Sequence, residues 1–266
     1  MARLQQAPVV YVLGVVRFPR MVDVDRLAAA IHPHLRSDFP TAVPIDAPHV
    51  NVTVGDEGIN VQQETIRTWQ FSSLNRDWAV ILNPGTIGLH TVAYTDNKDF
   101  LAMFASCIEA ASQVPEVGIE LVEAVAFRYV SRVVPSPDGT LADYFIPTVL
   151  PADLPDAREL RLQDGIFAAR YATECGNLRL QVLRRPPSVL PPELNTPVTH
   201  ANGWTLERPE GDFAVIDLDH GMTFDPPVRL DLTQLKDDMT RVRRPIRGVF
   251  DRIVTRRALT LWNGEA

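Results

Sequence analysis

Strand-like segments follow one another along this chain in clusters, and a long helical segment comes only after each cluster. This order argues against a doubly wound parallel fold, in which strands alternate with helices, and it favours an α+β fold. The first cluster and its helix fall within residues 1–135, and the second cluster and its helix fall within 136–266. The sequence therefore predicts two lobes of mainly antiparallel sheet, each packed by a long helix, which together form one compact unit.

Individual elements are identified from β-branched and aromatic runs between turn residues, or from apolar residues spaced three and four apart. The expected strands are 9–18, 49–54, 69–74, 78–82, 87–94, 119–134, 165–174, 178–184, 204–207 and 213–219. The expected helices are 23–35 with Asp23 as its cap, 99–113 with Asn97 as its cap, and 232–250 with an interruption near Pro245. The segment 253–262 is expected to be a strand or a short helix.

The composition is that of a globular protein. Of the 266 residues, 45% are hydrophobic and 22% are charged, which leaves enough apolar material for a core. Large aromatic side chains on the apolar faces of their elements should be buried. These are Trp69, Phe71, Phe104, Phe127 and Phe213.

The sequence gives no sign of a membrane segment or of export. No window approaches eighteen consecutive apolar residues, and residues 1–8 lack the apolar region and the cleavage site of a signal peptide. The two cysteines, Cys107 and Cys175, stand in unrelated settings, so no disulfide is expected. These observations predict a cytoplasmic protein.

Signature motifs of the common enzyme classes are absent from the sequence, and no cofactor is expected. The best carboxylate pair is Asp217 and Asp219, followed by His220. Residues two apart on a strand share a face, so both carboxylates and a nearby imidazole could bind a divalent cation. The alternative, which we favour, is that one carboxylate binds an arginine such as Arg128.

Arg128 lies on an expected strand with apolar neighbours, where it shares a face with Arg132 while Tyr129 takes the other face. A buried arginine must be paired. Its partner could be a phosphate or carboxylate of a ligand, or an aspartate across the sheet, and the aspartate is the commoner case.

Basic residues are concentrated near the C-terminus. Residues 236–257 contain eight basic and three acidic residues, although the whole chain has a net charge of −7. On a helix, Arg243 and Arg247 share a face, and with Arg244 they should project as a positive patch. Such a patch could bind an acidic protein surface or a nucleic-acid backbone, or it could be only a solvated face.

Seven segments occur in an order that resembles a sporadically distributed family of bacterial and archaeal proteins of about this length, for which no activity is established. They are 8–19, 35–40, 69–71 with Trp78, 89–94, 126–130, 215–219 and 249–255. The patchy distribution of that family suggests mobile genes, such as toxin–antitoxin or antiviral-defence modules.

Three functions are therefore open. The preferred one is a non-enzymatic binding or regulatory protein that acts through protein–protein contacts and binds its partner with Arg243, Arg244, Arg247 or Arg128. The second is an enzyme that handles a metal or phosphate with Asp217, Asp219 and His220. The third is a nucleic-acid backbone binder. A homo-oligomer is also left open, and a membrane partner is not expected.

Overall fold

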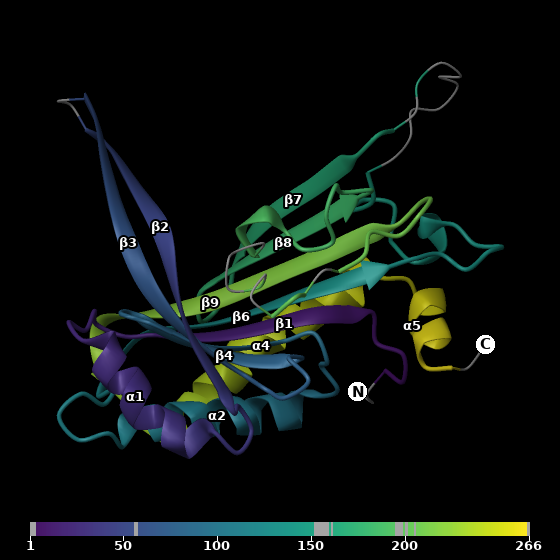
Figure 1. Ribbon diagram of the computed structural model, residues 1–266. Coiled ribbons are helices and arrows are strands. Elements are labelled where there is room, and N and C mark those ends of the chain that lie inside the picture. The colour runs from purple at the N-terminus through teal and green to yellow at the C-terminus, as the bar shows by residue number, and fades with distance from the viewer. Residues whose placement is uncertain are drawn as a thin grey trace.

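The computed structural model describes residues 4–55, 58–151, 160, 162–194, 199, 202–204 and 206–264. The predicted α+β class is confirmed (Figure 1). In chain order the elements are β1 (Val9–Arg17), α1 (Val24–Leu35), β2 (Thr41–Gly55), β3 (Gly58–Ser72), β4 (Trp78–Asn83), β5 (Thr86–Thr91), α2 (Asn97–Ser112), β6 (Leu121–Val133), β7 (Gly165–Ala172), β8 (Asn177–Arg184), β9 (Ala214–Arg229), α4 (Leu232–Ile253) and α5 (Arg256–Trp262). No helix in the described ranges is long and apolar enough to span a membrane.

The nine strands form one antiparallel sheet in the order β2-β3-β4-β5-β1-β6-β9-β8-β7. Strands from both halves of the chain belong to it, because β6 pairs along its length with β9. The β2–β3 hairpin extends well beyond the body of the molecule at one edge (Figure 1). The division of the chain at residue 135 into two lobes stays a prediction.

The first two helices begin where a side chain caps them. Asp23 accepts a hydrogen bond from the backbone N–H of Arg26 at 3.0 Å, as expected for the cap of α1. The cap of α2 is Asp96, one residue before the expected Asn97, and it accepts from the backbone N–H of Asp99 at 2.9 Å. Both residue types have an acceptor oxygen on a short side chain, so the sequence pattern does not separate them.

The expected interruption of the last long helix is not present, because α4 continues past Pro245 to Ile253. Proline has no N–H to donate to the carbonyl four residues earlier, which is that of Arg241. The thiol of Cys175 lies 3.8 Å from this carbonyl oxygen, within its hydrogen-bonding range, and satisfies it. Of the two alternatives for 253–262, the structure has a short helix, α5.

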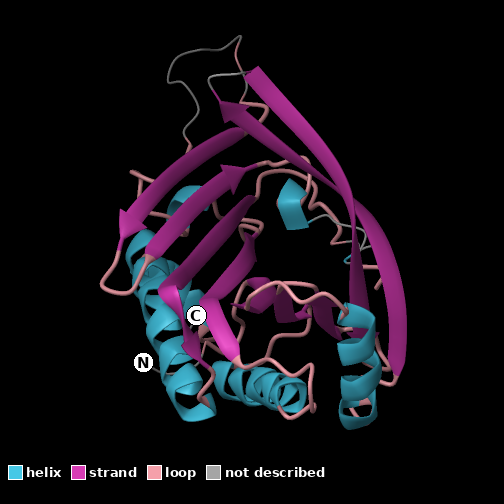
Figure 2. Ribbon diagram, turned by 90° about the vertical axis from the view of Figure 1, so that its left-hand side faces the viewer, coloured by secondary structure: helices cyan, strands magenta, loops and turns pink. Residues whose placement is uncertain are grey.

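The helices α1, α2 and α4 pack on one face of the sheet, which we call the helical face (Figure 2). Four of the five aromatic side chains expected in the core are fully buried, and Trp69 is half-buried with its indole N–H donating to Asp25 at 2.6 Å. The opposite face carries a second, smaller core, in which Tyr11 and Val130 of the sheet pack against Leu190 and Trp204. These last two residues belong to the β8–β9 connection, whose described residues are 185–194, 199, 202–204 and 206–213.

Candidate functional site

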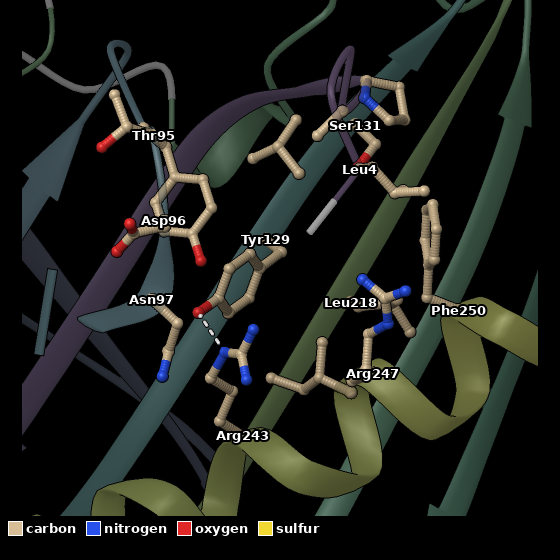
Figure 3. Close-up of a pocket in the computed structure, with 15 residues that line it drawn as sticks. Leu4, Thr95, Asp96, Asn97, Tyr129, Ser131, Leu218, Arg243, Arg247 and Phe250 are labelled. Atoms are coloured by element: carbon tan, nitrogen blue, oxygen red, sulfur yellow. Dashed lines mark hydrogen bonds between the residues drawn. The ribbon is translucent and has the colours of Figure 1, made fainter. Parts of the chain in front are cut away.

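A cavity of about 380 Å³ opens on the helical face, between the start of the chain, the β5–α2 loop and α4 (Figure 3). One wall is the segment from Leu4 to Val9, and another is the loop from Tyr94 to Asn97. Tyr129 and Leu218 of the sheet lie between them. Along α4, the lining residues are Arg243, Ile246, Arg247 and Phe250.

Helical spacing brings the lining residues of α4 together. Arg243 and Arg247 are four residues apart and lie on the same side of the helix, as the sequence predicts. Both are half-buried at the cavity, whereas Arg244 is exposed and does not line it. Two of the three arginines of the predicted patch therefore face a cavity, and only Arg244 projects freely.

Arg243 differs from its neighbours in its partners. Its Nε donates to the phenolic oxygen of Tyr129 at 3.2 Å (Figure 3), and Tyr94 also contacts the guanidinium. Burial lowers the pKa of Arg243, but the two phenols raise it above its ordinary value, so the charge is kept. Within the described residues no carboxylate lies within ion-pairing distance of Arg243.

Two arginines that flank Arg243 on α4 have carboxylate partners. Arg247 binds Asp251 at 2.9 Å, and Arg241 binds Asp238 at 3.1 Å. Arg243 is thus a half-buried positive charge held in position by neutral groups. Because a buried charge without a counter-ion is costly, this arrangement favours an external anion.

The pair of tyrosines, Tyr94 and Tyr129, is able to donate one hydrogen bond to such an anion. Burial raises the pKa of Tyr129 and of Tyr94, which keeps both phenols protonated at neutral pH. The two phenols also hydrogen-bond to each other, which uses one of their two hydrogens. Since Arg243 donates to the oxygen of Tyr129, the other hydrogen of the pair remains available for another acceptor.

Arg128 lies on the opposite face of the sheet. Its Nε and Nη2 each donate to Asp217 at 2.7 Å, and Nη2 also donates to Glu193 of the β8–β9 connection at 2.7 Å. The arginine is therefore paired with an aspartate across the sheet, the favoured alternative. It serves to fix the connection to the sheet, and it lies away from the cavity.

Arg179 completes this charged cluster. It binds Glu193 at 3.0 Å and Asp219 at 3.4 Å. Burial opposes the ionisation of Glu193, but its backbone hydrogen bond and the two arginines lower its pKa to about 2. Burial also raises the pKa of Asp219.

The structure does not bring His220 together with Asp217 and Asp219. Adjacent residues on a strand point to opposite faces, so His220 lies on the helical face, where its Nδ1 donates to the carbonyl of Val242 at 2.5 Å. Its Nε2 lies 2.9 Å from the hydroxyl of Thr173. Within the described ranges no group of three or more His, Cys, Asp or Glu side chains is arranged to hold a metal ion.

No model of a known protein family matches this chain, and no curated protein matches it. The case for a function therefore depends on the geometry of the cavity.

Sequence reasoning missed the contributions of Tyr94 and Glu193. Tyr94 follows a strand and Glu193 lies in a proline-rich connection, and neither position has a pattern that links it to an arginine. The alternation of Arg128 and Tyr129 along β6 was the one available signal that two different sites share this strand.

Proposed function

We propose that this chain is a non-enzymatic binding protein whose cavity beside Arg243 receives a carboxylate group of its partner. The observation that carries the proposal is that Arg243, half-buried in the cavity, has no carboxylate partner among the described residues. A guanidinium and a protonated phenol side by side match the acceptors of a carboxylate.

The charges around the cavity favour a monoanion. Arg247 lines the cavity but binds Asp251, and Asp96 contributes a carboxylate to the rim. One unpaired positive charge balances one negative charge. A nucleic-acid backbone would in turn require a track of unpaired basic residues along the surface.

The resemblance described above adds a setting to this proposal. A binding protein of this kind would act through protein–protein contacts in the cytoplasm, as part of a toxin–antitoxin or antiviral-defence module. The two free cysteines are compatible with a reducing compartment. A toxin-like or nuclease gene beside the coding gene would support this setting, and a metabolic operon would contradict it.

The binding proposal is tested with hexanoate and phenylacetate as probes and with the corresponding neutral amides as controls. Ligands that bind only the folded state stabilise it by about 2.7 kcal/mol at a hundred times their Kd. We expect the two acids to raise Tm and the amides to leave it unchanged.

Arg243→Met should abolish the effect of the acids, since methionine keeps the apolar stem and removes the charge. Arg244→Met is the matched control, because Arg244 is exposed on the same helix and outside the cavity. Equal responses to acids and amides, or an undiminished response in Arg243→Met, would overturn the proposal. Retardation of duplex DNA that depends on Arg244 as much as on Arg243 would favour the nucleic-acid alternative.

A further inference from the structure

One residue that lines the cavity, Thr95, has backbone groups without a hydrogen bond among the described residues. Thr95 is exposed, and these groups are its N–H and its C=O. Free backbone groups next to a binding site are suited to pairing with the amide of an extended peptide.

The cavity also has an apolar wall. Leu218, Ile246 and Phe250 are buried residues that line it, with exposed fractions of 2%, 4% and 8%. Its volume of about 380 Å³ is near the lower end for ligand pockets, which suits a single residue better than a long acyl chain.

We infer that the group bound here is the C-terminal residue of a partner polypeptide. Its carboxylate would bind Arg243 and the free phenolic hydrogen of the tyrosine pair. Its amide would face the backbone of Thr95, and its apolar side chain would pack on Ile246 and Phe250. This inference rests on the proposed function and deepens it, because it names the part of the partner that is recognised.

Two of the three alternative ligands lack one of these features. A fatty acid has a carboxylate and an apolar body but no amide for Thr95. An internal peptide segment has amides and side chains but no carboxylate on its backbone for Arg243. An N-acylated amino acid has the same chemistry as a peptide C-terminus, so only experiment separates these two sources.

The test uses isothermal titration calorimetry with a pentapeptide that ends in leucine as the free acid. Its controls are the same peptide as the C-terminal amide, N-acetyl-L-leucine, and hexanoate. We expect the peptide acid to bind at least roughly tenfold more tightly than its amide, the size of one lost charge-assisted hydrogen bond. This comparison uses the unaltered protein, so it does not depend on how a variant folds.

A second comparison tests the backbone contact. An ester analogue, in which oxygen replaces the last amide N–H of the peptide, should bind roughly two- to tenfold more weakly. Arg243→Met and the double variant Tyr94→Phe/Tyr129→Phe should each weaken binding of the peptide acid, while Arg244→Met should leave its affinity unchanged.

The outcomes separate the two proposals. Binding of hexanoate without binding of the peptide acid would overturn this inference and leave the proposed function standing. Equal affinity for N-acetyl-L-leucine and the peptide would assign the site to a small acylated amino acid and also overturn it. Failure of all three acids to bind would overturn both.

Discussion

Arg128 holds Asp217 through two hydrogen bonds of 2.7 Å each, and the carboxylate is fully buried beneath the β8–β9 connection. Removing Asp217 takes away the buried partner of Arg128 and leaves it with Glu193, whose side chain is partly exposed. We expect Asp217→Asn to lower the free energy of unfolding by about 3–5 kcal/mol, measured by urea titration. The double variant Arg128→Met/Asp217→Leu should lose less free energy of unfolding than the sum of the losses in Arg128→Met and Asp217→Leu.

The exposed pair of Arg17 and Glu123, at 3.1 Å, provides the control. Glu123→Gln should change the free energy of unfolding by less than about 1 kcal/mol. If Asp217→Asn and Glu123→Gln lower the free energy of unfolding equally, burial does not determine how much the pair of Arg128 and Asp217 contributes to stability.

His90 should make the protein sensitive to mild acid. Burial lowers the pKa of His90 to about 3, and its Nδ1 lies 3.2 Å from the hydroxyl of Tyr11. A lowered pKa means that the folded state needs the neutral imidazole. This contribution to stability is complete above the ordinary pKa of about 6.5 and is lost progressively as the pH falls toward 3.

The measurement is the urea midpoint at a series of pH values from 7.5 to about 4.5. His90→Asn should flatten the decline over that range, whereas His34→Asn, at an exposed position, should follow the unaltered protein. Parallel curves for His90→Asn and the unaltered protein would refute this role of His90.

The two cysteines should react at very different rates. Burial raises the pKa of Cys107 to about 12, whereas Cys175 is partly exposed in the β7–β8 turn. Since the thiolate is the reactive form, N-ethylmaleimide should modify Cys175 in the folded protein and Cys107 only after unfolding. Mass spectrometry of the digested protein checks this, and Cys175→Ser should remove the fast reaction. Labelling of both cysteines at one rate would contradict the burial of Cys107.

Gly176 should not tolerate a side chain. A Cβ at this turn position would lie 1.9 Å from the carbonyl oxygen of Gly221, which belongs to the backbone of β9 and cannot move aside. Gly176→Ala should therefore destabilise the fold by about 1–3 kcal/mol in a thermal melt. Gly85→Ala is the control, since its Cβ would meet only an ordinary contact of 3.7 Å. An unchanged Tm for Gly176→Ala would contradict the close approach of β8 to β9.

Much of the fold could be predicted because its elements depend on nearby residues. The strand expected at 119–134 is β6 (Leu121–Val133), and the strand expected at 178–184 is β8 (Asn177–Arg184). The joining of both halves into one sheet could not be predicted, since the pairing of β6 with β9 is decided by contacts between distant segments. The contact of Cys175 with the carbonyl that Pro245 leaves free in α4 likewise comes from a distant segment, which no helical pattern takes into account.

The candidate site could also be predicted only in part. Helical spacing predicts that Arg243 and Arg247 lie together, because both are on one element. The sequence predicts an exposed patch, but in the structure Arg243 and Arg247 line a cavity. Tyr129 and Tyr94, which also line it, come from two other segments of the chain. The pairing of strands across the sheet also determines that Arg128 binds Asp217. From the sequence alone, this ion pair was only one of the alternatives for Arg128.

The pairing of β6 with β9 also has a consequence for synthesis of the chain. β6 ends at Val133 and β9 begins at Ala214, so one edge of β6 has no partner while the ribosome adds the residues between them. At about 5–20 residues per second, these roughly 80 residues take on the order of 4–16 s. During that time the nascent chain presents an open, largely apolar strand edge on which other chains could pair. The yield of folded protein should therefore depend on the rate of translation between these two strands and on chaperones that shield the edge.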